Sequence, residues 1–263
     1  MFGINLNPVL PVRTKPAEQA EMCTQLLFGE FFEMLESTEK WCFIRNGNDH
    51  YEGWIDKKMI TYVDEKEFYS FSSHTHVQIF TPVAECFIHN KNEPIILPAG
   101  SFLHAYDNEA GTASIKENTY AIPTDAIMKR ASQPASGNLV VSIAKSFLNA
   151  PYLWGGKTVF GIDCSGLVQV CFGICGIGLP RDAYQQALKG ETVGWLQEAQ
   201  TGDLAFFEND EGKIIHVGML LNNSMIIHAS GKVKIDSIDA NGIILKESNK
   251  YSHKLSLIRR FVK

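Results

Sequence analysis

The chain has 263 residues, of which 45% are hydrophobic and 20% charged, and its formal net charge is −5 at pH 7. That balance is typical of a folded globular protein and argues against a disordered, collagen-like or disulfide-stapled chain. A net negative charge gives no field for holding nucleic acid or an anionic membrane, and no apolar run is long enough to cross a bilayer, so we expect neither as a partner.

The first residues lack the basic stretch and apolar core of a secretory signal peptide. The six cysteines show no CxxC pair and no regular spacing, which fits a reducing compartment. Cys171 and Cys175 lie one helical turn apart, and we expect buried thiols there, because no further metal ligand follows at finger-like spacing. These features predict a cytoplasmic protein without a metal site.

Short strand-like segments separated by turn signals fill residues 1–124 in two sets, the first ending near Val63 and the second beginning near Val77. Strands spaced this closely favour small barrels or sandwiches. The pattern Leu-x-x-Gly-Glu-Phe-Phe at 26–32 returns as Leu-x-x-Gly-Ser-Phe-Leu at 97–103. Two related barrels would explain this echo, and so would coincidence.

The first set also carries a family resemblance. Pro-Val-Arg-Thr-Lys-Pro at 11–16, Trp41 and Tyr-Glu-Gly-Trp-Ile at 51–55 resemble a bacterial SH3 domain, and the second set resembles a divergent copy. The resemblance implies two small all-β SH3-like barrels, at residues 1–66 and 67–124.

Residues 125–136 are expected to be a linker, because Ser, Pro, Ala and Gly dominate the second half of residues 123–138. After it, apolar residues recur at helical spacing, which predicts an amphipathic helix over 139–149 and further helices near 165–175 and 183–188. Four strands are expected after the helices, at 204–207, 214–221, 225–229 and 255–262. Helices followed by antiparallel strands indicate an α+β domain over 137–263.

Cys164 has an unusual neighbourhood for a single cysteine. It follows Asp163, a good N-cap, at the start of the second predicted helix. Amide groups at a helix N-terminus and the macrodipole favour thiolate over thiol there. The next residues, Ser165 and Gly166, are small enough to let a substrate backbone approach the sulfur. The alternative is a buried cysteine in an ordinary helix.

A thiol nucleophile needs a histidine to exchange its proton and a third polar group to orient that histidine. His216 lies in a strand-like run and His228 ends the next one. A two-residue turn at 222–223 would put the two histidines on opposite faces of the hairpin. A three-residue loop at 222–224 would pair His228 with Gly218 and put both on one face. Catalysis therefore requires an odd loop or a bulge.

Five motifs in order along residues 137–263 resemble those of the NlpC/P60 cysteine peptidases. They are Tyr-Leu-Trp-Gly-Gly at 152–156, Asp-Cys-Ser-Gly at 163–166, Leu-Pro-Arg at 179–181, Gly-Asp-Leu at 202–204 and His-Val-Gly at 216–218. The resemblance implies a papain-like fold with Cys164 as nucleophile, His216 as base and His228 as the orienting group. Members of the family cleave peptide bonds in the stem of bacterial murein, usually between D-glutamate and a diamino acid.

A closer resemblance narrows the substrate. Asp182 directly after Leu-Pro-Arg, and two SH3-like domains before the peptidase, resemble the γ-D-glutamyl-L-diamino acid endopeptidases. In that group the corresponding aspartate, with the positions of Asp163 and Ser165, meets the free α-amine of an N-terminal L-alanine. A carboxylate and acceptor oxygens suit an ammonium in a closed pocket. Asp182 is alternatively a helix N-cap before Ala183, and the two roles can coexist.

The same resemblance implies that the first SH3 domain closes one end of the substrate groove with an acidic side chain, for which Glu52 is the candidate. The alternative is a solvated turn carboxylate. Tyr152 would supply a hydroxyl to the oxyanion pocket beside the Cys164 backbone amide. The alternative for Tyr152 is an aromatic ring packed under its loop.

The residues and the family resemblances together imply a monomeric cysteine endopeptidase of cell-wall recycling that needs no metal or organic cofactor. It would hydrolyse the γ-D-glutamyl-diamino acid bond of murein peptides with a free N-terminal L-Ala, releasing L-Ala-D-Glu. The alternatives are an amidase or acyltransferase on the same fold and a non-catalytic murein-binding module. The presence of Cys164, His216 and His228 together counts against the binding module.

Overall fold

The computed structural model describes residues 1–73, 77–129, 135–245 and 250–262. The chain forms two compact units, one of Met1–Ser132 with Lys157–Val159 and the other of Gln133–Gly156 with Phe160–Lys263. Among the described residues, no helix is both long and apolar enough to cross a membrane.

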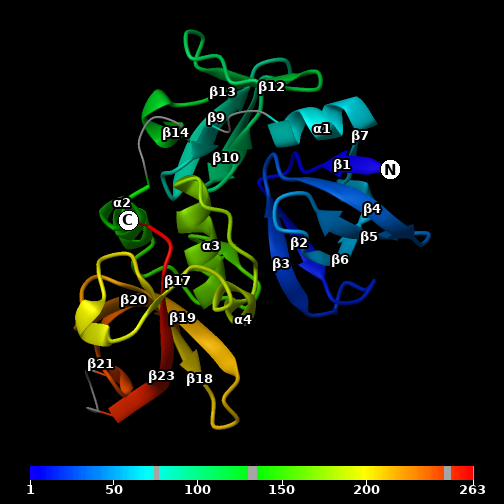
Figure 1. Ribbon diagram of the computed structural model, residues 1–263. Coiled ribbons are helices and arrows are strands. Elements are labelled where there is room, and N and C mark those ends of the chain that lie inside the picture. The colour runs from blue at the N-terminus through cyan, green and yellow to red at the C-terminus, as the bar shows by residue number, and fades with distance from the viewer. Residues whose placement is uncertain (74–76, 130–134, 246–249, 263) are drawn as a thin grey trace. The chain divides into compact units, whose positions relative to one another are not determined.

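The first unit consists mainly of antiparallel strands (Figure 1). Its elements are β1 (Phe2–Ile4), β2 (Val9–Arg13), β3 (Met22–Leu27), β4 (Phe31–Ser37), β5 (Trp41–Asn46), β6 (Glu52–Asp56), η1 (Lys57–Met59), β7 (Thr61–Val63), α1 (Glu65–Ser73), β8 (Val77–Ile79), β9 (Val83–Ile88), β10 (Glu93–Pro98), β11 (Phe102–Leu103), β12 (Thr112–Ile115), β13 (Asn118–Ala121), η2 (Thr124–Ala126), β14 (Ile127–Lys129) and β15 (Lys157–Thr158). The strands join in the orders β3-β2-β6-β5-β4-β1-β7, β10-β9-β13-β12 and β11-β8-β14.

Alternating burial along the strands builds two clusters of apolar side chains in this unit. Leu10 and Val12 of β2 point inward and pack with Leu26, Phe32 and other side chains of the first sheet. A second cluster joins residues of the first sheet to residues of the two later sheets. Period-two burial is the pattern that one buried face imposes on a strand.

The region expected to be a linker begins inside the first unit. Ile127–Lys129 form β14, which pairs with β8, and Ala126 just before it is buried in the second cluster. The strand forms because Ala126 and Ile127 contribute apolar surface to this core and the backbone completes a sheet edge. Composition alone gave no sign of this pairing.

A buried ion pair ties a late segment of the chain into the first unit. Lys157 Nζ lies 3.0 and 3.2 Å from the two carboxylate oxygens of Glu30. The same carboxylate accepts the Leu27 backbone amide at 2.6 Å, and the Lys157 backbone amide donates to Gln25 Oε1 at 2.8 Å. Both charged side chains are buried, so each neutralises a charge that would otherwise be costly to desolvate.

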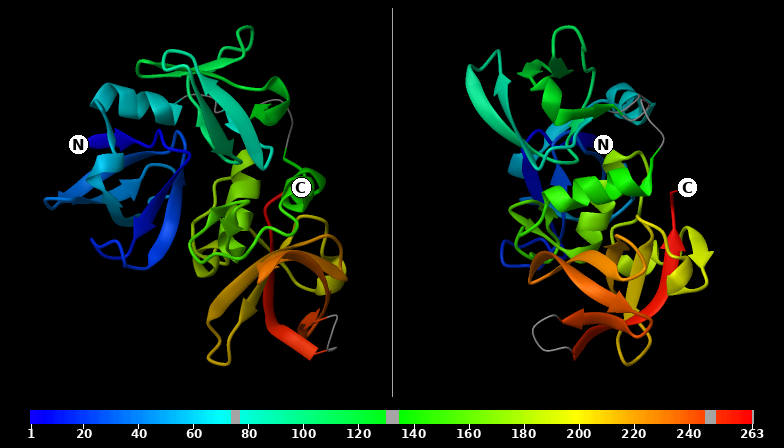
Figure 2. Two further views of the ribbon diagram at one scale, coloured as in Figure 1. Left: turned by 180° about the vertical axis from the view of Figure 1, so that it is seen from behind. Right: turned by 90° about the vertical axis from the view of Figure 1, so that its left-hand side faces the viewer.

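The second unit places its helices before most of its strands. Its elements are α2 (Gly137–Ser146), β16 (Gly161–Ile162), α3 (Cys164–Ile174), α4 (Ala183–Gln186), β17 (Glu191–Val193), η3 (Leu196–Glu198), β18 (Leu204–Glu208), β19 (Ile214–Leu220), β20 (Met225–Ser230), β21 (Lys232–Asp239), β22 (Gly242–Leu245) and β23 (Lys250–Arg260). Ser136 caps α2 by accepting the Leu139 amide at 3.3 Å. In both views of Figure 2 the helices lie on one side of the strands, with α3 packed against α2 and β19.

The main sheet of this unit closes on itself. Its order is β17-β23-β18-β19-β20-β21-β22, and β22 also pairs with β23. The enclosed face is apolar over most of its length, with Phe207, Leu220, Ile226, Ile238 and Ile243 in one buried cluster. Residues directly opposite one another in adjacent strands share a face, so the register of these strands decides which side chains join that interior.

Candidate active site

The candidate nucleophile begins helix α3. Asp163 caps the helix by accepting the Gly166 backbone amide at 2.7 Å. The Cys164 side chain is buried, and its thiol is hydrogen-bonded to the backbone amide of Val217 on β19. A Cβ atom on Gly166 would lie 2.4 Å from the carbonyl oxygen of Gly156. Glycine therefore lets the preceding loop approach the first turn of the helix.

The resting thiol is not favoured as a thiolate. Burial raises the pKa of Cys164 to about 11, and the nearby Asp163 carboxylate also raises it. The hydrogen bonds from backbone amides lower the pKa by less than this. The expectation that the helix N-terminus favours the thiolate is therefore wrong for this site, because desolvation outweighs the helix end. A base must take the thiol proton as the sulfur attacks.

His216 on β19 and His228 on β20 share one face of their hairpin. Met219 pairs with Ile227, so the chain reverses through the three residues 222–224. This is the odd loop that the catalytic interpretation requires, and that prediction is confirmed. Nε2 of His216 lies 2.9 Å from Nδ1 of His228.

Gly218 gives the two histidines their room. A Cβ atom at this position would lie 2.9 Å from the His228 Cβ and 2.7 Å from Cδ1 of Ile226. Neither neighbour can retreat easily, since both are fully buried. A side chain at 218 would push β20 away from β19 where the histidines meet.

Asp236 on β21 extends the pair into a chain of hydrogen bonds. Nε2 of His228 lies 3.0 Å from Oδ2 of Asp236, and Lys234 Nζ reaches the same oxygen at 3.0 Å. The hydrogen bond from His228 lowers the pKa of Asp236, and Lys234 lowers it further against the opposing effect of burial. Asp236 is thus an ionised acceptor.

This chain of hydrogen bonds fixes the tautomers of both imidazoles. Because the Asp236 carboxylate only accepts, His228 carries its proton on Nε2 and presents the lone pair of Nδ1. His216 then donates from Nε2, which leaves its Nδ1 with the lone pair of a general base. Burial lowers the pKa of His216 well below its usual value, and His253, His228 and Lys234 lower it further, so this base is neutral at pH 7.

Sequence reasoning missed Asp236, although a signal for it exists. Gly231 has φ +70 and joins β20 directly to β21, so that Ser230 pairs with Lys232. If the pairing continues along β20 and β21 from this turn, His228 pairs with Lys234. Asp236 lies two residues beyond Lys234 and so is on the same face of the sheet. His253 was also missed, and its ring lies 4.1 Å from that of His216 between centroids.

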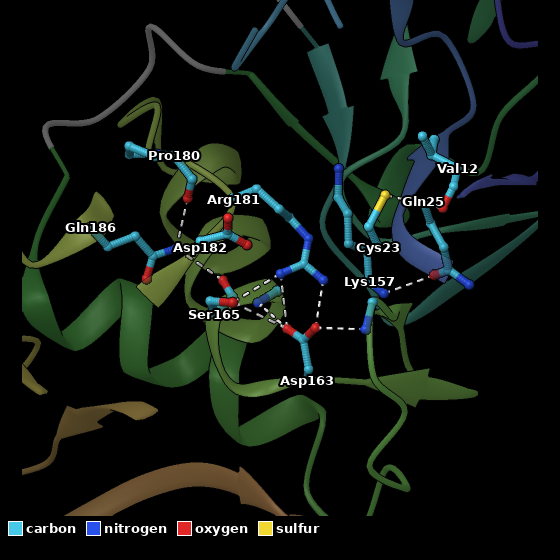
Figure 3. Close-up of polar contacts among 12 residues, drawn as sticks. Val12, Cys23, Gln25, Lys157, Asp163, Ser165, Pro180, Arg181, Asp182 and Gln186 are labelled. Atoms are coloured by element: carbon cyan, nitrogen blue, oxygen red, sulfur yellow. Dashed lines mark hydrogen bonds and ion pairs between the residues drawn. The ribbon is translucent and has the colours of Figure 1, made fainter. Parts of the chain in front are cut away.

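Arg181 lies between Asp163 and Ser165 (Figure 3). Its guanidinium donates to both carboxylate oxygens of Asp163, at 3.0 and 2.6 Å, and to Ser165 Oγ at 2.9 Å. Asp163 Oδ2 also accepts the Gly155 amide at 2.8 Å. The carboxylate of Asp163 therefore holds the loop, the helix start and Arg181 together, and sequence reasoning did not include this arginine in the site.

Asp182 follows Arg181 and is the N-cap of α4. The Gln185 side chain returns to the Asp182 backbone amide at 3.4 Å. Gln186 donates to the carbonyl oxygens of Ser165 and Pro180, at 3.1 and 2.8 Å, and so joins this turn to α3 (Figure 3). The structure thus gives Asp182 the cap position that was the alternative, beside the residues expected to bind an amine.

Tyr152 lies in the loop before α3. Burial raises the pKa of Tyr152 to about 12, and the neighbouring Cys164 and Asp163 also raise it. The phenol therefore stays protonated and remains a hydrogen-bond donor, as an oxyanion pocket requires. Its backbone amide donates to the carbonyl oxygen of Gly231 at 3.0 Å, which fixes the loop beside the β20–β21 turn.

Glu52 belongs to the first unit, at the start of β6. Its carboxylate pairs with Arg45, with Nη2 at 2.7 Å and Nε at 2.8 Å, and both side chains are exposed. Its expected contact with substrate stays a prediction.

Two parts of the chain match known protein families. Residues 149–249 match the NlpC/P60 family, and residues 12–60 match the bacterial dipeptidyl-peptidase Sh3 domain. The chain is 30% identical over 249 residues to the gamma-D-glutamyl-L-lysine dipeptidyl-peptidase of Bacillus subtilis, an alignment that covers 90% of this chain and 80% of that protein. It is 27% identical over 246 residues to dipeptidyl-peptidase 6 of Lysinibacillus sphaericus, covering 86% of this chain and 87% of the other.

Among solved structures, an NlpC/P60 family protein from Bacillus cereus shares the fold, with a TM-score of 0.84, 20% sequence identity and full coverage of both chains. The chain belongs to the NlpC/P60 family of cysteine peptidases, with a bacterial SH3 domain near its N-terminus.

Proposed function

We propose that this peptidase hydrolyses the bond between the γ-carboxyl of D-glutamate and a diamino acid in murein peptides that carry a free N-terminal L-Ala, releasing L-Ala-D-Glu. The observation that carries the chemistry is the hydrogen bond between the Val217 amide and the Cys164 thiol, because it makes the nucleophile a neighbour of His216. The name of the Bacillus subtilis relative, a gamma-D-glutamyl-L-lysine dipeptidyl-peptidase, supports the bond that is cleaved.

The proposed reaction is acyl transfer through a thioester. Nδ1 of His216 takes the thiol proton as the sulfur of Cys164 attacks the γ-carbonyl carbon. The oxyanion is stabilised by the Cys164 backbone amide and the Tyr152 hydroxyl. His216 then protonates the departing α-amine of the diamino acid. Water, deprotonated by the same imidazole, attacks the thioester and restores the thiol.

We assign recognition of the free amine to the acidic turn before α4. The Arg181 guanidinium and the Asp163 carboxylate form a buried ion pair, and Asp182 places a second carboxylate at the next position, the N-cap of α4. An ammonium group matches the charge of that carboxylate, and Ser165 Oγ adds an acceptor. An acetylated N-terminus would bury the carboxylate without a cation. Glu52 of the first SH3-like domain is proposed as a further acidic contact with the substrate.

We propose that residues 67–124 form a second SH3-like barrel, because one turn is repeated in detail. Gly29 and Gly100 both have positive φ, 79° and 87°. The Gly29 amide donates to the Asn5 carbonyl at 2.8 Å, and the Gly100 amide donates to the Ile79 carbonyl at 2.8 Å. The return hydrogen bonds also match. The Asn5 amide donates to the Glu30 carbonyl at 2.9 Å, and the Ile79 amide donates to the Ser101 carbonyl at 3.0 Å.

We place the activity in the recycling of cell-wall peptides in the cytoplasm. All six cysteines lie among the described residues and are free thiols, which supports a reducing compartment. We also propose that a monomer is active, because the same unit supplies Cys164, His216, His228 and Asp236.

The proposal is tested by cleavage of L-Ala-γ-D-Glu-L-Lys and its meso-diaminopimelate counterpart, each beside its N-acetylated twin, with products read by mass spectrometry. Release of L-Ala-D-Glu from the free-amine peptides only, and none with Cys164→Ala, is the expected result. Equal cleavage of the acetylated peptides would contradict the proposed recognition of the free amine by Asp182. Absence of cleavage with wild type would favour an amidase, an acyltransferase or a binding module.

A further inference from the structure

The imidazole of His216 lies against a second histidine ring that the proposed reaction does not use. The rings of His216 and His253 are stacked, with centroids 4.1 Å apart and planes 26° apart. Phe207 contacts both rings, at 5.7 and 5.9 Å between centroids. The ring of His228 stands at a steep angle to both histidines, 84° and 85°. The ring of His228 on β20 thus contacts the edge of the His216 ring, and the ring of His253 on β23 contacts its face.

The sheet is irregular at the residues that build this stack. Between β18 and β19 the register shifts after Phe207, beside its partner His216. Between β22 and β23 it shifts so that Ile243 pairs with His253 while the next residue pairs with Tyr251. Bulges re-aim side chains and are common beside active sites. The extra residue, Ser252, turns His253 toward the interior that holds His216.

Backbone approach at this bulge requires a glycine. Gly242 has φ +147, and a Cβ atom there would lie 1.8 Å from the carbonyl oxygen of His253. The ring of His253 is further fixed by Ser252, whose Oγ lies 2.9 Å from Nδ1. The fold therefore holds the His253 ring from its backbone and from its side chain.

A stack supplies what the hydrogen bond to His228 lacks. One bond at Nε2 fixes a point on the His216 ring, but the imidazole can still rotate about the line through that bond. A ring lying flat against the imidazole fixes its plane. We propose that His253 is a positioning residue of the active site, which holds the plane of the His216 ring while the proton passes between Cys164 and the leaving amine. This inference rests on the proposed roles of Cys164 and His216.

The charge state of His253 suits this role. Burial lowers the pKa of His253 to about 4, and His228 and Lys234 contribute to the lowering. The ring is therefore neutral when His216 becomes protonated during turnover, and a neutral aromatic face attracts a cation. Charged or titratable groups that act on this pair are His228 on β20 and Lys234 and Asp236 on β21.

The test compares His253→Phe, which keeps a flat ring, with His253→Leu, which keeps apolar bulk without one. Tyr251→Leu is the matched control, because this exposed aromatic residue lies two positions earlier on the same strand. Iodoacetamide alkylation of Cys164, located by peptide mass spectrometry over roughly pH 5 to 8, reports proton transfer to His216 without any peptide substrate. Kinetics on L-Ala-γ-D-Glu-L-Lys and thermal unfolding are measured on the same proteins.

We expect His253→Leu to lower both the alkylation rate and kcat by about tenfold or more with KM nearly unchanged, since a displaced base costs rate rather than binding. His253→Phe should retain both rates within about threefold, as a ring-for-ring exchange preserves the stack. Equal rates in the Leu and Phe variants, or a loss confined to KM, would overturn the proposal. If His253→Leu does not fold, His253→Met takes its place. If wild type cleaves no peptide, the alkylation rates still decide the role of His253.

Discussion

Nε2 of His228 lies 3.0 Å from a carboxylate oxygen of Asp236, and both side chains are buried. The hydrogen bond places the His228 proton on the nitrogen that faces away from His216. His228 can then accept from His216, which in turn leaves Nδ1 of His216 free of a proton. A residue that touches neither sulfur nor substrate thus decides which nitrogen of the base is active.

We therefore expect Asp236→Ala to lower kcat by about 10- to 100-fold, the usual cost of removing a partner that orients an active-site imidazole. KM should change little, because Asp236 is proposed to act through His228. The measurement is steady-state cleavage of the free-amine tripeptide, with far-UV circular dichroism to verify folding. Lys234→Met, which keeps the carboxylate, should cost less, and an equal or larger loss for Lys234→Met would contradict this order of roles.

The sequence predicts the features of this site that depend on residues close together in the chain, and it does not predict those that depend on distant strands. The N-cap before Cys164 follows from local spacing, and the shared face of His216 and His228 follows from hairpin register. Both features are present in the structure. Asp236 is related to His228 only through a second hairpin, whose register is set at Gly231. The position of the His253 ring depends on a β-bulge and on the pairing of β22 with β23 that closes the sheet, and no local sequence pattern encodes either feature.

The same limit applies to charge. The helix N-terminus at Cys164 predicted a stabilised thiolate, but the pKa is raised because the thiol is buried. Likewise, Arg181 was seen only as part of a motif, whereas it ties Asp163 to Ser165. Burial and long-range ion pairing result from tertiary packing. Residue spacing therefore indicates which residues could form a site but not how far their pKa values are shifted or which charges pair.

Gly218→Ala should damage both folding and catalysis. The added methyl would sit 2.9 Å from the His228 Cβ and 2.7 Å from Ile226, so β20 must shift. Overpacking of this kind costs about 1–3 kcal/mol of unfolding free energy. Denaturant unfolding and kcat measure the two effects.

Gly173→Ala provides the matched comparison, because a Cβ atom in that position of α3 meets nothing within 4 Å. Helix propensity should make this variant more stable by about 0.5–1 kcal/mol with unchanged kcat. The steric account of Gly218 would be wrong if the two alanine variants were equally stable and active.

Glu30→Gln should destabilise the first unit strongly. It removes the carboxylate that neutralises Lys157 while leaving the ammonium buried. Breaking a buried pair on one side costs about 3–5 kcal/mol, whereas replacing both partners with apolar residues is far milder. Denaturant unfolding of Glu30→Gln beside the double variant Glu30→Leu, Lys157→Leu measures the difference.

Glu211→Gln serves as the control for charge removal in general. Its partner Lys213 lies 2.7 Å away, but both side chains are more than two-thirds exposed. Exposed pairs contribute roughly 0–1 kcal/mol, so little change is expected. A loss for Glu30→Gln no larger than that for Glu211→Gln would show that the Glu30–Lys157 pair is not buried in solution.

Acid should destabilise the wild type partly through His253. The pKa of this side chain is lowered from 6.5 to about 4 by burial, so between these values the unfolded chain binds a proton that the folded chain does not. Stability contributed by the neutral ring is therefore complete above pH 6.5 and declines as the pH falls toward 4. His216 acts in the same direction, since its pKa is also lowered. The unfolding free energy of wild type, measured by urea titration across this range, should fall relative to that of His253→Phe as the pH falls, because only wild type loses the His253 contribution. Parallel curves for the two proteins would mean that His253 titrates alike in the folded and unfolded chain.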